Sequence, residues 1–517
     1  MKNQELQATW AYHNGTKHSD ESIRTNRHYL DWDNQPIPLK IYSKLEPVPL
    51  PQHLSSSGMT ALEAISNSDA SLRDQVVPSI QILAEILYLS AGITRRRSYP
   101  GGEMLFRAAA CTGALYHIDL YLVCGELPDL QAGVYHFGPQ DFALRQLRVG
   151  DYRDILVEAS GREPAIANAP VIIVCASTYW RNAWKYQSRA YRHCYWDTGT
   201  ILANLLAAAI GRHTPARIVL GFIDDAVDRL LSLDPVREGV TAIVALGNIP
   251  AQAKGSSTAV APLEFETAPL SKTEIDYPAI RAMHEASSLE SKEEVTDWRA
   301  MINSSTRAKS QSTTSNERLI ALRSLSDAEI PRDTIEEVIQ RRGSTREFSR
   351  ESITFERFST MLDRATRGIP FDFLHPEEPP INDLYLIVHA VDDLSPGAYV
   401  FHRESNSLEL LKEGDFRRDA GYLGLGQEIP ADCSVDVFFL VDLNRVLERF
   451  GNRGYRAAQL EASVIGGKLY LAAYAQRLGA SGLTFFDDEV TKFFSPHATG
   501  KSVMFLLALG RSVKRKL

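Results

Sequence analysis

The stretch Asp119-Leu-Tyr-Leu-Val123 returns later in the chain as Asp383-Leu-Tyr-Leu-Ile387, so the residue number rises by 264 between the two copies (383 − 119). Two more pairs keep this spacing (397 − 133 and 453 − 189): Gly133-Val-Tyr-His-Phe137 with Gly397-Ala-Tyr-Val-Phe401, and Arg189-Ala-Tyr-Arg192 with Arg453-Gly-Tyr-Arg456. Solenoid repeats have periods of roughly 20–50 residues, so this spacing predicts two globular copies that pack as an intramolecular pseudo-dimer.

Composition excludes several classes of protein. The 517 residues are 44% hydrophobic and 23% charged, with a net charge of −8, so electrostatic binding to nucleic acid is not supported. No apolar run reaches the roughly 18 residues of a membrane helix, and the N-terminus is polar, so we expect a cytoplasmic protein without membrane segments. The five cysteines lack CxxC spacing and the histidines lack metal-ligand spacing, so we expect neither disulfides nor a metal site.

The pattern of apolar residues predicts an α+β fold for each copy. Helices are expected at 61–67, 79–90, 198–210, 334–342 and 457–478, and strands at 118–123, 171–177, 384–390, 435–441 and 503–509. The Gly- and Arg-rich segment 92–102 is expected to be a loop. The predicted organisation is an N-terminal arm (1–55), a first domain (56–250), a linker with a possible docked helix at 275–291 (251–330), and a second domain (331–517).

A cluster of arginine and serine follows the predicted helix 334–342 and comprises Arg341, Arg342, Ser344 and Arg346. Forked guanidinium donors beside a hydroxyl suit a phosphate monoester. The alternative is a solvated basic helix end, because cations are favoured near a helix C-terminus.

Several motifs together resemble one family. Arg341-Arg-Gly-Ser-Thr-Arg-Glu-Phe348 in a body of two α+β copies resembles the FMN-dependent nitroreductase superfamily. Phe106-Arg-Ala-Ala-Ala-Cys-Thr-Gly-Ala-Leu-Tyr-His-Ile-Asp-Leu-Tyr-Leu-Val123 is similar to the flavin loop of the SagB-type dehydrogenases, the azoline oxidases that form thiazoles and oxazoles, although Ala110 and Cys111 replace Pro and Ser. Lys185-Tyr186, Arg189-x-Tyr-Arg192 and Tyr12-His13-x-x-Thr16-Lys17 match further signatures of that group.

The resemblance implies a flavin at the interface between the copies, with the phosphate cluster of one copy facing the loop of the other. Aligning 61–65 with 334–338 puts Ser68 and Asp69 opposite Arg341 and Arg342, and 373–380 lies opposite the loop 110–117, so each copy lacks a different half. We therefore expect one FMN per chain. The predicted cofactor-binding residues are Arg107, Cys111, Thr112, Gly113, Ala114, Leu115, Arg341, Arg342, Ser344, Arg346, Thr484, Arg511 and Lys514.

Lys185 and Tyr186 are the predicted catalytic pair, because their counterparts at the same displacement, Arg449 and Phe450, cannot relay a proton near neutral pH. In the azoline oxidases the resemblance implies that Lys or Tyr removes a proton while hydride passes to flavin. We expect Arg181, Arg189 and Arg192 to lower the pKa of Lys185. The alternative for Lys185 is an exposed stem packed on an aromatic ring.

Three further expectations concern residues outside the predicted cofactor site. Arg189, Tyr191 and Arg192 recur and are therefore expected to be structural. Asp224-Asp225 and Asp487-Asp488 look like a helix cap and its repeat. Gly466-Gly467 and Ala207–Ala209 are expected to pack at an interface rather than contact a cofactor.

Three functions remain open. The first is oxidation of a small molecule or a modified peptide, such as a peptide azoline, with O2 reoxidising the flavin. The second is NAD(P)H-driven reduction of quinones or nitroaromatics, although no GxGxxG follows a predicted strand. The third is a non-catalytic partner subunit in a biosynthetic complex, either flavin-binding or purely structural.

Overall fold

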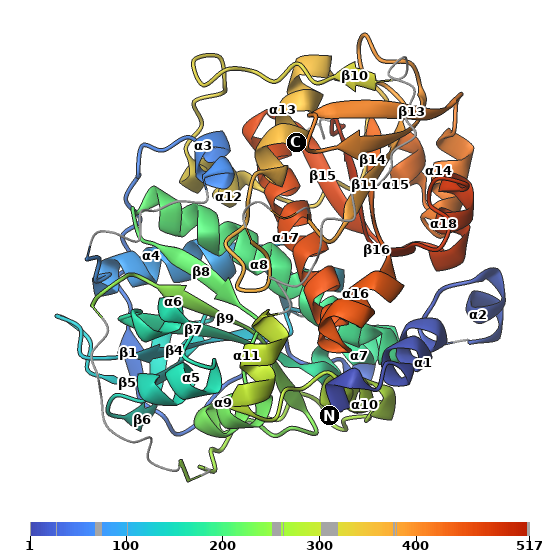
Figure 1. Cartoon of the computed structure of the whole chain (residues 1–517). Helices are drawn as coiled ribbons and strands as arrows, with labels where there is room; N and C mark the ends of the chain where they lie inside the picture. The colour runs from blue at the N-terminus through green and yellow to red at the C-terminus, as the bar shows by residue number, and fades with distance from the viewer. Residues whose placement is uncertain are drawn as a thin grey trace.

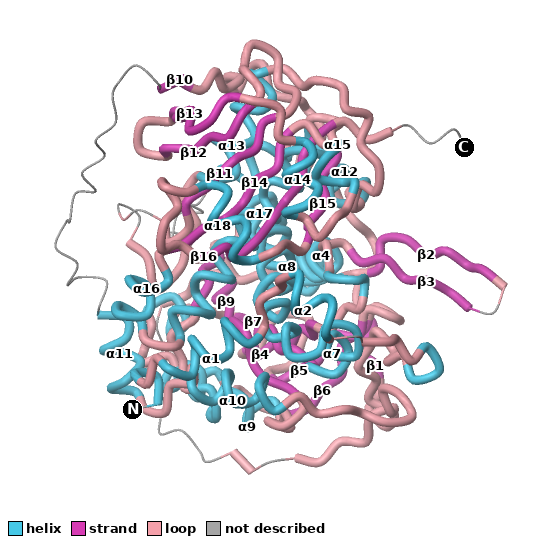
Figure 2. The backbone as a smooth tube through the Cα atoms, turned by 90° about the vertical axis from the view of Figure 1, so that its right-hand side faces the viewer, coloured by secondary structure: helices cyan, strands magenta, loops and turns pink. Residues whose placement is uncertain are grey.

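The computed structural model describes residues 2–26, 28–67, 75–100, 102–250, 260–261, 263–300, 319–375, 378 and 380–513 (Figures 1 and 2). Two seven-stranded antiparallel sheets form its body, with the strand orders β1-β6-β5-β4-β7-β9-β8 and β10-β13-β12-β11-β14-β16-β15. The two orders correspond strand by strand, which confirms the predicted α+β fold and its duplication.

The first sheet comprises β1 (Pro47–Pro49), β4 (Ile118–Cys124), β5 (Gly133–Gly138), β6 (Ala143–Val149), β7 (Val171–Thr178), β8 (Ala216–Val219) and β9 (Glu238–Leu246). The second comprises β10 (Leu319–Ala321), β11 (Asp383–Val388), β12 (Gly397–His402), β13 (Ser407–Glu413), β14 (Val435–Val441), β15 (Gly479–Leu483) and β16 (Ser502–Gly510). Every residue of the central strands β4, β7, β9 and β14 is buried, as their continuous apolar sequences require.

The helices of the first copy are α3 (Ala61–Ser66), α4 (Ile80–Ala91), α5 (Arg153–Ala159), α6 (Pro164–Ala167), α7 (Tyr179–Tyr186), α8 (Ala190–Gly211) and α9 (Asp224–Leu231). Those of the second are α12 (Ile335–Arg341), α13 (Phe355–Thr366), α14 (Arg417–Leu423), α15 (Glu428–Asp432), α16 (Leu443–Phe450), α17 (Arg453–Ala475) and α18 (Asp487–Phe494). Four more helices are α1 (Gln7–Gly15), α2 (Asp20–Thr25), α10 (Pro278–Ala286) and α11 (Lys292–Ala300).

Helices α8 and α17 pack against each other at the centre of the molecule (Figure 1). Ser463 Oγ donates a 2.9 Å hydrogen bond to the carbonyl of Tyr195 across this contact. A Cβ on Gly467 would lie 2.5 Å from the Cβ of Ala203, so only glycine permits this approach, as predicted for an interface position. Gly466 instead makes room for the ring of Phe505 in its own copy.

Two reciprocal clusters of ion pairs also join the copies. Arg189 and Arg192 of the first copy bind Asp487 of the second at 3.0 and 2.6 Å. Arg453 and Arg456 of the second copy bind Asp224 of the first at 2.7 and 2.5 Å. All six side chains are buried, which confirms the structural role predicted for Arg189 and Arg192.

The prediction that these aspartates are helix caps is wrong. Asp224 and Asp487 are the first residues of α9 and α18, and the cap positions before them make no side-chain cap hydrogen bond. The carboxylates turn towards the arginines because two buried guanidinium groups need a buried anion.

The repeated unit extends into the segments predicted as arm and linker. Carbonyls of His13 and Thr16 accept hydrogen bonds from Arg192 and Arg189, and carbonyls of His284 and Ser287 accept them from Arg456 and Arg453. Helix α1 of the arm is therefore the counterpart of α10, which lies within 275–291. Strands β1 and β10 likewise occupy the same edge of the two sheets.

The segment 92–102 was predicted as a loop, and this is wrong. It contains β2 (Ile93–Tyr99), which pairs with β3 (Gly102–Arg107) in a separate two-stranded sheet that projects from the body (Figure 2). Neither face of the outer hairpin is buried, so its sequence lacks the alternation that marks a half-buried strand. Among the described helices, none is long and apolar enough to cross a membrane.

Candidate functional site

The loop between β3 and β4 is held in place by one carboxylate. Asp197 on α8 accepts hydrogen bonds from the Thr112 amide (2.9 Å), the Thr112 hydroxyl (2.7 Å) and the Cys111 thiol (3.0 Å), and it contacts His117 Nε2 at 2.8 Å. Burial and the neighbouring carboxylate raise the pKa of Cys111, so the thiol stays protonated and donates. Gly113 has φ +64° and is exposed at the tip of this loop.

Arg342 brings the second copy onto this loop. Its Nε donates to the carbonyl of Ala108 at 2.9 Å and its Nη2 to the carbonyl of Arg107 at 3.0 Å. The guanidinium also lies 5.9 Å from the ring centre of Tyr470. Burial lowers the pKa of Arg342, and none of the acidic residues that the structure describes pairs with it. A half-buried cation of this kind favours the binding of an anion.

Three other predicted cofactor-binding residues are engaged elsewhere. Arg341 pairs with Asp333 at 2.6 Å. Arg107 is buried and donates to the carbonyl of Pro38 at 2.7 Å. Arg511 donates to the carbonyl of Ser352 at 2.9 Å. Lys514 lies outside the described residues.

Ser344 lies beside the same tyrosine as Arg342. Its Oγ is 3.3 Å from the hydroxyl of Tyr470, and that hydroxyl accepts from the amide of Gly482 at 2.5 Å. Gly482 is exposed although Ser481 and Leu483 on either side are buried, so β15 presents an open backbone position here. The hydroxyl of Thr484 is buried and has no partner among the described residues.

Lys185 and Tyr186 end α7 beside this loop. A Cβ on Gly113 would lie 2.9 Å from the Tyr186 hydroxyl, and Lys185 Nζ lies 5.4 Å from the Tyr186 ring centre. Burial and then the charge of Arg346 lower the pKa of Lys185. Burial, with the nearby Asp197 carboxylate, raises the pKa of Tyr186, so its hydroxyl is a donor and Lys185 is the better base.

The expected source of the lowered Lys185 pKa is therefore corrected. Arg181 is paired with Asp119 at 2.6 Å, and Arg189 and Arg192 are both paired with Asp487. Arg346 comes from the second copy and is exposed, without an ion pair among the described residues. The cation that acts on Lys185 thus reaches it across the interface.

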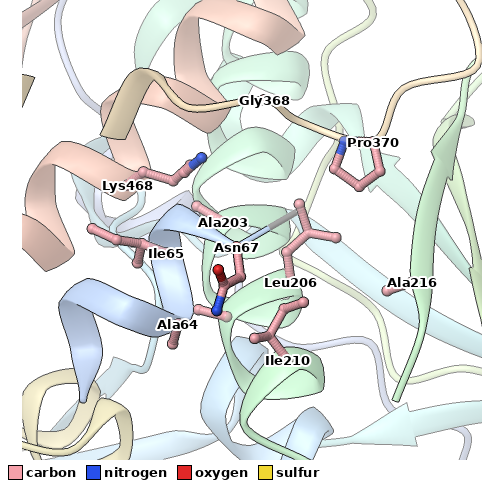
Figure 3. A pocket seen from close by; sticks show the side chains of 11 residues that line it. Ala64, Ile65, Asn67, Ala203, Leu206, Ile210, Ala216, Gly368, Pro370 and Lys468 are labelled. Carbon is pink, nitrogen blue, oxygen red and sulfur yellow. The ribbon is translucent and has the colours of Figure 1, made fainter. Parts of the chain in front are cut away.

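The symmetric counterpart of this site is filled. At the displacement that relates the two copies, Tyr470 and Tyr474 correspond to Leu206 and Ile210, and Asn204 corresponds to Lys468. Leu206, Ile210 and Lys468 line a cavity of only about 20 Å³, which has room for about one water (Figure 3). Lys468 Nζ donates to the carbonyl of Arg367 at 2.7 Å, and burial lowers its pKa to about 7.

The capping boxes refine the predicted alignment of the phosphate cluster. Thr60 caps α3 with Glu63, and Thr334 caps α12 with Glu337. Counting seven positions from each threonine puts Asn67, rather than Ser68, opposite Arg341. Ser68 then corresponds to Arg342 and, like Asp69, lies outside the described residues. The conclusion that the first copy lacks the arginine pair is unchanged.

Sequence reasoning missed two residues at this site, and the repeat itself held the signal for both. Asp197 recurs in the second copy as Glu461, which accepts from the amides of Ile381 and Asn382 as Asp197 does from its own loop. Tyr470 differs from its counterpart Leu206. An acidic residue that recurs in both copies and a tyrosine that occurs in only one of them are the sequence signals that could have identified these two residues.

A scan against family models matches the nitroreductase family over residues 112–248 and 338–511. The chain belongs to the nitroreductase family. Membership assigns it to the oxidoreductases, and the two matched regions confirm the predicted tandem arrangement.

Known proteins extend this result. The nitroreductase-like protein MJ1384 of Methanocaldococcus jannaschii is 24% identical over 157 residues, which are 30% of this chain and 75% of that protein. The microcin B17-processing protein McbC of Escherichia coli is 27% identical over 144 residues, which are 27% of this chain and about half (49%) of McbC. A crystal structure of a nitroreductase-like protein from Anabaena variabilis superposes with a TM-score of 0.75 at 26% identity, covering 98% of this chain and 99% of its own.

Proposed function

We propose that the chain binds one FMN between its two copies and oxidises a substrate at that flavin. The unpaired guanidinium of Arg342 carries this proposal, because it is half-buried, lies on the loop of the other copy and needs an anion. A flavin phosphate supplies one. Ser344 offers a hydroxyl beside it, and the exposed backbone at Gly113 and Gly482 gives a flat ring close access from both copies.

One flavin per chain is supported by the filled counterpart of the site. A cavity of about 20 Å³ cannot hold a flavin ring, and Lys468 with two aliphatic side chains stands where the functional side has Asn204 and two tyrosines. The second copy also has a different sequence, 373–380, where the first copy has the loop 110–117. The two halves that survive are Arg342 with Ser344 from one copy and the 111–115 loop from the other.

Bound FMN would accept a hydride from the substrate, and the residues here would move the accompanying proton. Lys185 receives it, because its lowered pKa makes a neutral amine more available. Tyr186 keeps its proton and donates a hydrogen bond to a substrate heteroatom. Oxidation of an azoline to an azole needs this pair of events, loss of one hydride and one proton, with O2 as the final acceptor. The similarity to the microcin B17-processing protein McbC favours a peptide as substrate, and the resemblance of 106–123 to the azoline oxidases favours an azoline within it.

The alternative is reduction of quinones or nitroaromatics by NAD(P)H at the same site, and the similarity to MJ1384 supports it. One anaerobic experiment separates the two. The purified chain is loaded with FMN, its flavin-to-chain ratio is measured, and its absorbance is followed after addition of an azoline peptide or of NADPH. We expect a ratio near one and bleaching by the azoline peptide. Bleaching by NADPH alone would favour the reductase, and absence of flavin after FMN addition would leave only a non-catalytic role.

A further inference from the structure

Among the residues that the structure describes, only the first copy has a β2–β3 hairpin. Helices α4 and α13 are equivalent, and their first residues differ by 275 in residue number (355 − 80), whereas Asp119 and Asp383 differ by 264. The first copy is therefore longer by the difference (275 − 264) between these points, and the hairpin accounts for the extra length. It occurs in the copy whose loop faces Arg342.

One face of the hairpin is basic and without acidic residues. The register pairs Arg95 with Phe106, Arg97 with Met104 and Tyr99 with Gly102, so these side chains share a face. Arg95 stacks on Phe106 at 4.4 Å, and Arg97 has no ion pair among the described residues. The opposite face is neutralised, because Arg96 pairs with Glu103 at 3.0 Å.

This face leads directly into the candidate site. Strand β3 ends at Arg107, whose carbonyl accepts from Arg342 Nη2 at 3.0 Å. The charge of Arg95 also contributes to the lowered pKa of Arg342, which places the two guanidinium groups near each other. A ligand bound along this face of the hairpin would therefore extend into the site between the copies.

The hairpin is also an open template for a further strand. It forms a sheet of only two strands, so the outer edge of β2 carries backbone groups without a strand partner among the described residues. Residues at i and i+2 of a strand lie about 6.7 Å apart on one face, so carboxylates with the same alternation in an added strand would lie opposite Arg95 and Arg97. Tyr99, on β2 itself, is 53% exposed and offers an apolar contact to its other side chains.

We propose that the hairpin binds an extended acidic peptide segment as a third strand along β2, with alternate carboxylates paired to Arg95 and Arg97. The proposal rests on the proposed function in one respect: the docked segment belongs to the substrate peptide. The hairpin would hold this segment while the residue to be oxidised reaches Lys185. Binding itself requires no flavin chemistry.

The test uses the full chain and a fluorescein-labelled peptide of alternating Asp and Thr, long enough to span β2. Fluorescence anisotropy gives its Kd for the wild type and for two matched variants, Arg97→Gln and Arg96→Gln, which each remove one positive charge from β2 on opposite faces. We expect Arg97→Gln to weaken binding about five-fold and Arg96→Gln less than about two-fold, with about a 20-fold loss for Arg95→Gln/Arg97→Gln. Equal losses for Arg96→Gln and Arg97→Gln would overturn the proposal.

Two further peptides sharpen the result. A Lys-Thr peptide should not bind, and the Asp-Thr peptide with N-methylated backbone amides should bind at least about ten-fold more weakly if it adds as a strand. Undiminished binding of the N-methylated peptide would overturn strand addition. The flavin-to-chain ratio is measured on the same samples: peptide binding without flavin would refute the proposed function alone, and flavin without peptide binding would refute the docking proposal alone.

Discussion

The Nε atom of Arg342 lies 2.9 Å from the carbonyl oxygen of Ala108, so the arginine of one copy rests on the loop of the other. The neighbouring Arg341 is turned the other way, onto Asp333. Two adjacent arginines with the same sequence signature therefore have different tasks. Of these two described arginines, only Arg342 has no acidic partner, and it can therefore bind an anion between the copies.

This difference predicts unequal effects on flavin binding. Arg342→Ala should raise the Kd for FMN about 10- to 100-fold, because a charge-assisted contact to phosphate contributes about 1.5–3 kcal/mol. Arg341→Ala should change it less than about three-fold. Titration of FMN fluorescence quenching measures both constants. An equal loss in the two variants would mean that the ion pair of Arg341 rearranges when flavin binds.

Much of the fold was predictable because it depended on local pattern and on the repeat. Buried strands such as β7 and β14 have continuous apolar sequences, and the displacement of 264 shared by three motif pairs indicated the pseudo-dimer. The hairpin at 93–107 was not predictable, because an exposed strand has no face pattern. Side-chain direction was also beyond the sequence: nothing local distinguishes Arg341 from Arg342, and the cation acting on Lys185 comes from the other copy.

The position of Arg346 predicts a shift in the pH profile. The positive charge of Arg346 helps to lower the pKa of Lys185, so Arg346→Gln should raise that pKa. A base acts only when deprotonated, so the rise of kcat/KM with pH should move to higher pH in this variant and disappear in Lys185→Met. Arg350→Gln is the matched control, because Arg350 is exposed and pairs with Asp432. A rise that persists in Lys185→Met would exclude Lys185 as the base, and an unshifted profile in Arg346→Gln would mean that Arg346 does not act on it.

The buried ion pairs between the copies predict a stability difference at adjacent aspartates. Asp224→Asn leaves Arg453 and Arg456 buried without an anion and should lower the free energy of unfolding by about 3–5 kcal/mol. Asp225→Asn removes only an exposed pair with Arg229, worth about 0.3–0.5 kcal/mol. Urea denaturation at pH 7 measures both. Similar losses in the two variants would show that the buried pairs do not stabilise the interface.

The same buried pairs have a defined pH dependence. Arg453 and Arg456 hold the pKa of Asp224 at about 2, below its ordinary value of 3.8. A depressed carboxyl pKa gives stability that is present above about pH 4 and is lost as the pH falls towards 2. Wild type should therefore lose stability relative to Asp224→Asn over this range, and the difference between their urea midpoints should narrow. A constant difference down to pH 2 would contradict the assignment.

Lys468 predicts a second rise of stability with pH, on the alkaline side. Its pKa of about 7 in the fold lies below the ordinary 10.5, so the folded chain holds the neutral amine more readily than the unfolded chain does. Below about pH 7 the folded chain must bury the charged amine, which costs stability. The contribution of Lys468 to the free energy of unfolding should therefore rise between about pH 7 and 10. Lys468→Met removes this slope and should stabilise the chain at pH 6 by about 1–3 kcal/mol, because an aliphatic side chain suits the apolar cavity.

In the same variant the flavin-to-chain ratio should stay near one, since the surrounding Leu206 and Ile210 still fill the second site. A ratio approaching two in Lys468→Met would mean that this lysine alone keeps the second flavin out.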